Sequence, residues 1–386
     1  MKLSKVEPYV VCVPKGDRGN AFFFLIRLLT DDGMYGWGET ALGGSLNDIR
    51  RVYPVLVEES FNAFVKGNSP FDRELVSGVL YRRMMNSRPD LILMGIISAF
   101  DTAMWDICGK VLGKPVYDLL GGKCRDRLRS YSYIYTPDNA GDPESVAAEA
   151  LRMKERGFTA VKYDPVPVTN DNDSGSSIRP FQLSLAGLKR ADAIMAAIRK
   201  AVGDEVDIMI GTHGQITTSS AIRLAKVLEP YQPLWFEEPV PPENRDEMAV
   251  VSRSTTIPVS TGERLAGIHE FREVLERKTA RILQPDIGSC GGISAGRKIA
   301  AMAEAYYAEM AYHIWGGPVI TAAALQLDAV IPNFLIQESI YDSSSGLFGS
   351  IQTQKLLWKD GYFMTPDLPG IGVDFDMTMI HRMSAT

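Results

Sequence analysis

The sequence predicts an α/β protein built as a (β/α)8 barrel, with a smaller α+β domain before it and a short segment after it. From about residue 127 onward, eight short apolar segments alternate with segments of helical periodicity, which is the pattern that eight β-α units require. Before residue 127, a hairpin pattern and several amphipathic helices indicate a different architecture. The 386 residues, 45% hydrophobic and 23% charged, are enough for a sizeable core in two domains.

The N-terminal domain is expected over residues 1–126 and begins with a hairpin. Its predicted strands are Phe22–Leu29 and Tyr35–Glu39, which are separated by a turn ending in glycine. Three helical patterns follow, over Leu46–Val65, Phe71–Met85 and Ile97–Leu112. The last segment, residues 361–386, has little helical periodicity over Gly361–Asp376, and we expect it to pack on the N-terminal domain.

The barrel is expected over residues 127–360. The predicted strands are Leu128–Tyr133, Ala160–Tyr163, Asp207–Ile210, Leu234–Glu237, Val259–Thr261, Arg281–Leu283, Met310–His313 and Leu335–Glu338. The helices predicted between them include Pro143–Arg156, Gly187–Val202, Ser219–Leu228, Ile268–Arg277 and Ser294–Ala308. One connection, Pro165–Leu185, is unusually long and polar, which indicates either a loop at the catalytic face or a solvated insertion without a role.

The composition argues against several classes of partner. The net charge is −6 and no dense run of Lys or Arg occurs, so we expect no nucleic-acid partner. The N-terminus is polar, and the most apolar stretches, Ala21–Leu29 and Leu91–Phe100, are shorter than the roughly 20 residues of a membrane helix. The four cysteines lie far apart, as expected for free thiols. We therefore expect a cytoplasmic protein with no membrane partner.

Ionisable residues stand at nearly every predicted strand end, where barrel enzymes carry their chemistry. Any one of them could be a structural polar group, but random placement would not produce the whole set. These residues are Lys162, Asp164, His213, Glu237, Glu238, Glu263, Arg264, Asp286, His313 and Glu338.

Two groups among them suggest specific chemistry. Glu237 and Glu263 would repel each other unless a cation lies between them, and oxygen ligands favour Mg²⁺. The alternative is that these carboxylates pair with Arg264 or another base. His313, with Asp286 one strand earlier, makes a plausible base dyad in which the carboxylate orients the imidazole. The alternative is a buried histidine that donates to a backbone carbonyl.

Several motifs resemble those of the enolase superfamily, in its mandelate racemase-like branch. They are Gly36–Thr40, Ser98–Asp106, Pro115–Gly122, Trp235–Pro239, Thr261–Leu265, Gln284–Asp286 and Pro369–Gly372. The resemblance covers essentially the whole chain and implies a capping domain on a barrel. Within the branch, the sequence is most similar to acid-sugar dehydratases of the galactonate, gluconate and mannonate type. Three features carry this: His213, the stretch from Leu228 to Asn244, and the absence of a second lysine after Lys162.

The resemblance implies a role for each residue of the site. His313, held by Asp286, would take the proton α to the substrate carboxylate, while Lys162 would help neutralise that carboxylate. Glu338 would form a hydrogen bond on the opposite side. His213, when protonated, would donate to the departing β-hydroxyl, and the resulting enol would tautomerise to a 2-keto-3-deoxy acid.

The resemblance also implies a cofactor and substrate contacts. Mg²⁺, bound by Glu237 and Glu263, would stabilise the enediolate. Arg264, Asp164 and Arg18 are candidate substrate-binding residues. Arg18 and the nearby Lys15 lie in a glycine-containing loop and could meet a distal carboxylate, or they could be solvated surface charges. A homo-oligomer, dimer or octamer, is also implied.

The sequence departs from the family pattern at Gly211, where the family has an aspartate that binds the metal. Three interpretations remain open. Water or another side chain such as Asp164 fills the coordination position, His213 turns to the metal and is not the acid, or the metal site is weakened. The function is therefore expected to be Mg²⁺-dependent dehydration of a sugar acid. The alternatives are a racemase, epimerase or cycloisomerase that uses the same intermediate, or a non-catalytic sugar-acid binder.

Overall fold

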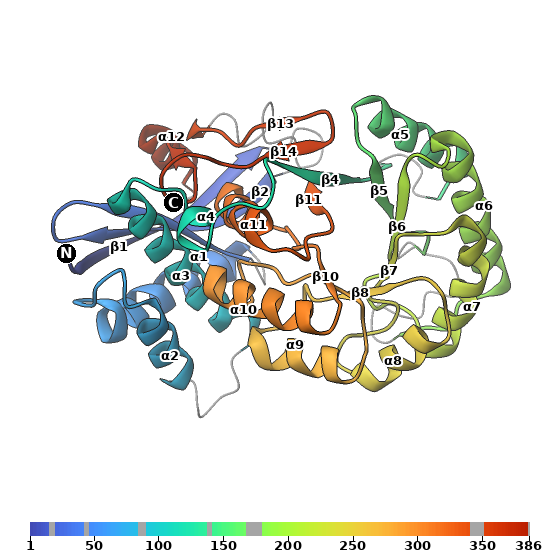
Figure 1. Ribbon diagram of the computed structural model, residues 1–386, viewed down its shortest axis with the longest axis horizontal. Coiled ribbons are helices and arrows are strands. Elements are labelled where there is room, and N and C mark those ends of the chain that lie inside the picture. The colour runs from blue at the N-terminus through green and yellow to red at the C-terminus, as the bar shows by residue number, and fades with distance from the viewer. Residues whose placement is uncertain are drawn as a thin grey trace.

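The computed structural model describes residues 1–14, 20–41, 46–83, 90–136, 141–166, 180–339 and 351–384. It has an N-terminal α+β part and a barrel of parallel strands, which lie beside each other in Figure 1. The predicted fold class is confirmed. Arg18, Lys15 and most of the long connection, residues 167–179, lie outside the described residues.

The N-terminal part is a three-stranded antiparallel sheet covered by helices. The strands are β1 (Leu3–Pro14), β2 (Asn20–Thr30) and β3 (Tyr35–Thr40), and the helices are α1 (Leu46–Ser60), η2 (Phe61–Val65), α2 (Arg73–Arg83), α3 (Leu91–Leu112) and α4 (Val116–Leu119). The hairpin of β2 and β3 is confirmed. β1 was not predicted, because its first half is mostly polar and contains Pro8, a residue that is rare inside strands.

Helix α3 is the central helix of this part and begins six residues earlier than predicted. Asp90 caps it by accepting a hydrogen bond from the Leu93 N–H at 2.9 Å. The helix packs so closely on β3 that a Cβ atom at Gly38 would lie 2.0 Å from a backbone oxygen of α3. Among the described residues α3 is the one helix long and apolar enough to cross a membrane, but 78% of its apolar window is buried inside the protein.

Eight parallel strands form the barrel, and seven helices connect them. The strands are β4 (Arg127–Tyr133), β5 (Ala160–Tyr163), β6 (Asp207–Gly211), β7 (Trp235–Glu237), β8 (Val259–Thr261), β9 (Ile282–Leu283), β10 (Glu309–Met310) and β11 (Gln337–Ser339). The helices are α5 (Pro143–Glu155), α6 (Leu185–Val202), α7 (Thr218–Leu228), α8 (Arg245–Arg253), α9 (Gly267–Glu276), α10 (Gly292–Ala305) and α11 (Pro318–Val330), with a short η3 (Glu229–Tyr231).

The barrel closes between its last two strands and its first. β11 pairs with β4, and a bridge from Met310 to Phe334 links β10 to the residues just before β11. Helices α5–α9 surround the strands on their outer side (Figure 1). Within the described residues no barrel helix follows β11. The elements described after β11 along the chain are four short strands and a helix: β12 (Gln352–Gln354), β13 (Trp358–Lys359), β14 (Tyr362–Met364), β15 (Asp374–Phe375) and α12 (Met377–Met383).

The C-terminal residues contact both parts. β14 pairs with β4 of the barrel, whereas Asp374 accepts hydrogen bonds from Tyr35 Oη at 2.7 Å and Trp37 Nε1 at 2.8 Å. Helix α12 lies beside β1 in Figure 1, where Val11 and Ser384 form a bridge. These contacts hold the end of the chain on the N-terminal sheet. The domain limits at residues 126 and 360 remain predictions.

Candidate active site

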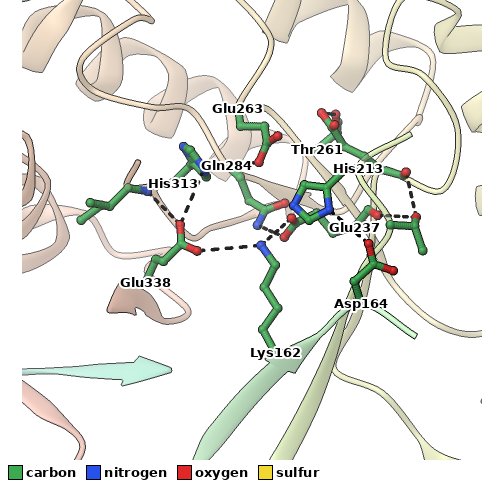
Figure 2. Close-up of polar contacts among 12 residues, drawn as sticks. Lys162, Asp164, His213, Glu237, Thr261, Glu263, Gln284, His313 and Glu338 are labelled. Atoms are coloured by element: carbon green, nitrogen blue, oxygen red, sulfur yellow. Dashed lines mark hydrogen bonds and ion pairs between the residues drawn. The ribbon is translucent and has the colours of Figure 1, made fainter. Parts of the chain in front are cut away.

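The ionisable residues singled out in the sequence converge at the C-terminal edge of the barrel strands (Figure 2). Parallel strands bring their carboxyl ends to the same edge, so residues far apart in sequence meet there. Lys162 on β5, Glu237 at the end of β7 and Glu338 on β11 project from the strands themselves. The others follow a strand by one to three residues and lie in the adjoining loops: Asp164, His213, Glu263, Asp286 and His313.

His313 and Asp286 form the predicted contact. His313 Nδ1 lies 2.7 Å from Asp286 Oδ2, and Asp286 Oδ1 accepts a hydrogen bond from the Gly288 N–H, also at 2.7 Å. His313 Nε2 faces the opposite way and lies 3.3 Å from Glu263 Oε2. Burial opposes protonation, but the charges of Glu263 and Glu338, with the Asp286 hydrogen bond, raise the pKa of His313 to about 10 without a cation. Asp286 holds Nδ1, so the ring directs Nε2 at the carboxylates.

Three side chains form a candidate metal-binding group. They are His213, Glu237 and Glu263, and one ring nitrogen and two carboxylate oxygens of theirs lie within 4.8 Å of one another. Glu237 is 1% exposed, and its Oε2 accepts a hydrogen bond from Gln284 Nε2 at 2.6 Å. Its other oxygen, Oε1, forms an ion pair with Lys162 Nζ at 2.5 Å. A carboxylate can accept more than two contacts, so the three donors together fit a divalent cation. Because His213 belongs to this group, the donors are not oxygen alone.

Lys162 supplies the positive charge on the strand side of the site. Its Nζ lies 2.5 Å from Glu237 Oε1 and 3.8 Å from Glu338 Oε1, and its side chain is 2% exposed (Figure 2). Burial disfavours the ammonium, but the charges of Glu237 and Glu338 prevail and raise the pKa of Lys162 above its usual range. Glu338 is held in place because its Oε2 accepts the Ile314 N–H at 2.9 Å. Lys162 is therefore a fixed cation in the site.

His213 lies on the other side of Lys162 and contacts Asp164. The distance from His213 Nδ1 to Asp164 Oδ2 is 3.4 Å, and Gln215 Nε2 donates to the same oxygen at 2.9 Å. Burial raises the pKa of Asp164, although its hydrogen bonds oppose the shift. Burial lowers the pKa of His213, whereas the hydrogen bond to Asp164 raises it, and the net shift of this pKa is upward. The backbone of His213 is in the left-handed region, with φ 49°, which is uncommon for a residue other than glycine.

Gly211, the position where the sequence departs from the family that it resembles, faces this group of residues. A Cβ atom there would lie 2.8 Å from Lys162 Cε and 3.6 Å from both Glu237 Oε1 and His213 Cε1. A side chain at this position would therefore point between the lysine, the glutamate and the histidine. With glycine, the Lys162 side chain occupies that space.

The predicted substrate-binding residues have different surroundings. Arg264 forms an ion pair with the buried Glu238, with a distance of 2.8 Å from Nε to Oε2. Burial and the charge of Glu263 raise the pKa of Glu238 to about 7, although Arg264 opposes the shift. Asp164 contacts His213, as described above. The roles assigned to Arg264, Asp164 and Arg18 remain predictions, as do the other site roles.

The cavity beside these residues has a volume of about 360 Å³. His213, Glu263, Asp286 and His313 line its barrel side. The remaining lining residues were not identified from the sequence, and several come from the N-terminal part: Ala41, Tyr53, Leu91, Ile92, Ser289 and Trp315. They carry no charge, so no motif in the sequence marked them. Gln284 was also missed as a site residue, although it lies in the Gln284–Asp286 motif.

Comparison with known proteins defines the class. The family model described as "Mandelate racemase / muconate lactonizing enzyme, N-terminal domain" matches residues 3–121, and "Enolase C-terminal domain-like" matches residues 145–379. The chain therefore belongs to the mandelate racemase/muconate lactonizing enzyme family of the enolase superfamily. The family resemblance in the sequence is confirmed.

Similar proteins of known name within this family include dehydratases. D-galactonate dehydratase of Ralstonia nicotianae is 35% identical over 368 residues, which are 94% of this chain and 91% of the relative. D-xylonate dehydratase of Haloferax volcanii is 33% identical, over 94% of this chain and 85% of the relative. A solved mandelate racemase/muconate lactonizing enzyme from Jannaschia sp. is 36% identical with a TM-score of 0.91, covering 100% of this chain and 98% of that one. The chain is thus an enzyme of the hydro-lyase group of its family.

Proposed function

We propose that this enzyme removes water from a sugar acid, an aldonate or aldarate, and yields a 2-keto-3-deoxy acid, with a divalent cation as cofactor. Mg²⁺ is the cation that the family resemblance implies. The observation that carries the proposal is the His313–Asp286 pair, in which Nε2 of His313 faces carboxylates that belong to a group of donors fit for a cation. A base beside a cation suits removal of a proton α to a carboxylate.

His313 is the base in this proposal. Its Nδ1 is engaged by Asp286 at 2.7 Å, so Nε2 is the nitrogen that takes the α-proton. Asp286 holds the ring in this orientation and stabilises the imidazolium once the proton has moved. The cavity of about 360 Å³ beside Nε2 has room for a small organic acid.

Lys162 acts on the substrate carboxylate, and Glu338 forms a hydrogen bond on the opposite side. The ammonium of Lys162 lies between Glu237 and Glu338, at 2.5 and 3.8 Å, and it balances negative charge that moves onto the substrate oxygens. A divalent cation held by Glu237, Glu263 and a third donor supplies further positive charge for the same oxygens. Uncharged Tyr53 and Trp315 line the cavity and help to exclude water.

Elimination then removes the β-hydroxyl. The electrons of the broken C–H bond form the C2–C3 double bond of an enol, and the C–O bond at C3 breaks as the hydroxyl accepts a proton and leaves as water. Two histidines line the cavity and can hold that proton, His213 and His313. The released enol takes a proton at C3 to give the keto product.

A screen of the purified protein against a library of aldonic and aldaric acids tests the proposal. 2-Keto acid formation is measured with Mg²⁺ or Mn²⁺ and again with EDTA. We expect at least one acid to be converted with the cation and not with EDTA. Conversion that continues in EDTA would contradict the cation's role, and a complete blank would contradict the dehydratase. The cytoplasmic location and the homo-oligomer are further expectations that this screen does not address.

A further inference from the structure

We infer that His213, oriented by Asp164, is a protein ligand of the cation together with Glu237 and Glu263, and is not the proton donor for the leaving hydroxyl. The inference deepens the proposed function and rests on it for the cation's presence. It gives the site one nitrogen and two carboxylate donors. Such a site holds Mn²⁺ more tightly than Mg²⁺, because imidazole is a better ligand for first-row transition ions than for Mg²⁺.

The first observation is the position of the three donors. The His213 nitrogen and the oxygens of Glu237 and Glu263 lie within 4.8 Å of one another. Donors bound to one octahedral ion at about 2.1 Å lie roughly 3–4 Å apart, so small side-chain movements complete the site. Glu237 Oε1 is buried and lies 2.5 Å from Lys162 Nζ, and its carboxylate keeps further lone pairs for a cation beside that contact. Glycine at 211 contributes no donor, and His213 is the third donor of this group.

The second observation is the contact between His213 and Asp164. Histidines that bind metals usually offer their other ring nitrogen to a carboxylate, which fixes the tautomer. Here His213 Nδ1 faces Asp164 Oδ2 at 3.4 Å, which leaves Nε2 on the side of Glu237 and Lys162 (Figure 2). Asp164 is itself held, because its Oδ1 accepts the Val166 N–H at 2.8 Å. The contact with Asp164 therefore turns Nε2 toward the cluster.

The third observation is the turn that carries His213. Its φ of 49° turns the backbone sharply just after β6. The flanking residues are bonded to the end of β7: Thr212 Oγ1 donates to the Glu237 carbonyl at 3.0 Å, and the Gly214 N–H donates to the Glu238 carbonyl at 2.7 Å. The turn is therefore attached to the same backbone that carries Glu237. An uncommon conformation held in this way positions a side chain for function.

The inference also reassigns the proton for the leaving hydroxyl. A ring nitrogen bound to a cation has no proton to give, and Nδ1 of His213 faces Asp164. His313 gains a proton from the α-carbon in the first step and can pass it to the β-hydroxyl, which leaves as water. One proton is removed and the same proton is returned, so no second acid is needed.

Pulsed electron paramagnetic resonance of Mn²⁺-loaded protein tests the inference without reference to turnover. Electron spin echo modulation detects the ¹⁴N nucleus of an imidazole bound directly to Mn²⁺. We expect this modulation in the wild-type protein and in His313→Asn, and we expect its loss in His213→Asn. Asparagine tolerates the left-handed backbone at 213, so the variant should fold. Absence of the ¹⁴N modulation in the wild type, or its persistence in His213→Asn, would overturn the inference.

Calorimetric titration with Mn²⁺ and Mg²⁺ gives a second measurement. We expect His213→Asn to weaken Mn²⁺ binding by tenfold or more and Mg²⁺ binding by less, so that the preference for Mn²⁺ shrinks. Asp164→Asn should weaken Mn²⁺ binding by about 10–100-fold while the ¹⁴N modulation remains. Unchanged affinities in both variants, or no Mn²⁺ binding by the wild type, would contradict the assignment. Keto-acid formation by the wild type is measured separately, so failure of the ligand assignment and failure of the proposed function are distinguishable.

Discussion

Replacement of His313 by asparagine removes the proposed base with little change in shape. Asparagine retains an amide that can donate to Asp286, which His313 contacts at 2.7 Å, but it has no basic nitrogen facing the cavity. The variant should therefore fold and bind the cation while losing the ability to take the α-proton. His269→Asn is a matched control, because His269 is exposed on α9 and does not line the cavity.

The size of the loss follows from the surroundings of Nε2. The nearest carboxylates are Glu263 at 3.3 Å and Glu338 at 3.9 Å. Glu263 is engaged by the cation in our proposal, and Glu338 accepts the Ile314 N–H, so neither replaces the base. Removal of a general base lowers the rate by about 10²–10⁴-fold. That factor corresponds to about 3–5 kcal/mol of activation free energy, and we expect the upper part of this range.

Proton nuclear magnetic resonance in D₂O measures the step directly, because loss of the substrate's α-proton signal reports proton removal by exchange or by elimination. We expect the rate for His313→Asn to fall by about 10³–10⁴-fold and the rate for His269→Asn to stay within about twofold of wild type. Loss of the signal from His313→Asn at more than a tenth of the wild-type rate would refute the assignment of His313 as the base.

Three other perturbations test separate parts of the account. Gly211→Asp places a carboxylate next to Glu237 and should tighten Mg²⁺ binding by about tenfold in calorimetry, and an unchanged affinity would mean that position 211 does not face the cation. Asp106→Ala removes the acceptor of three hydrogen bonds, two of them from backbone N–H groups, and should lower the free energy of unfolding in urea by about 3–5 kcal/mol. Burial raises the pKa of Glu39 from 4.5 to about 8, so between these pH values the folded protein holds a proton that the unfolded chain releases. The free energy of unfolding should therefore fall as the pH rises from 4.5 to about 8, and it should fall less steeply in Glu39→Gln. Equal slopes for the two proteins in urea titrations would contradict this.

The barrel was predictable because its pattern is local. Each strand is short, apolar and bounded by turn residues, and helices of clear periodicity separate most of the strands. Helix α11 was missed because its sequence lacks such a pattern. All of its residues, Pro318–Val330, are buried, so it has no polar face and no amphipathic period. β1 was missed because the first half of its sequence is mostly polar and contains Pro8.

The residues that form the site were predictable, because parallel strands bring their carboxyl ends to the same edge of the barrel. Lys162, Glu237 and Glu338 could be placed there by counting along each strand. The pairing of side chains could not, because it depends on rotamers and loop geometry. Arg264, for example, contacts Glu238, a pairing that its position in the sequence did not indicate. The sequence left three interpretations of Gly211 open, and only the distances around His213 favour one of them.

The most direct test of the central claim is mass spectrometry of the product formed in D₂O from an acid identified in the screen. The account predicts a 2-keto acid that has lost one water and carries one solvent deuterium at C3, because the enol takes its final proton from solvent. A product with the elemental composition of the substrate and a deuterium at C2 would contradict the dehydratase, and would show that the same base serves an epimerase or racemase.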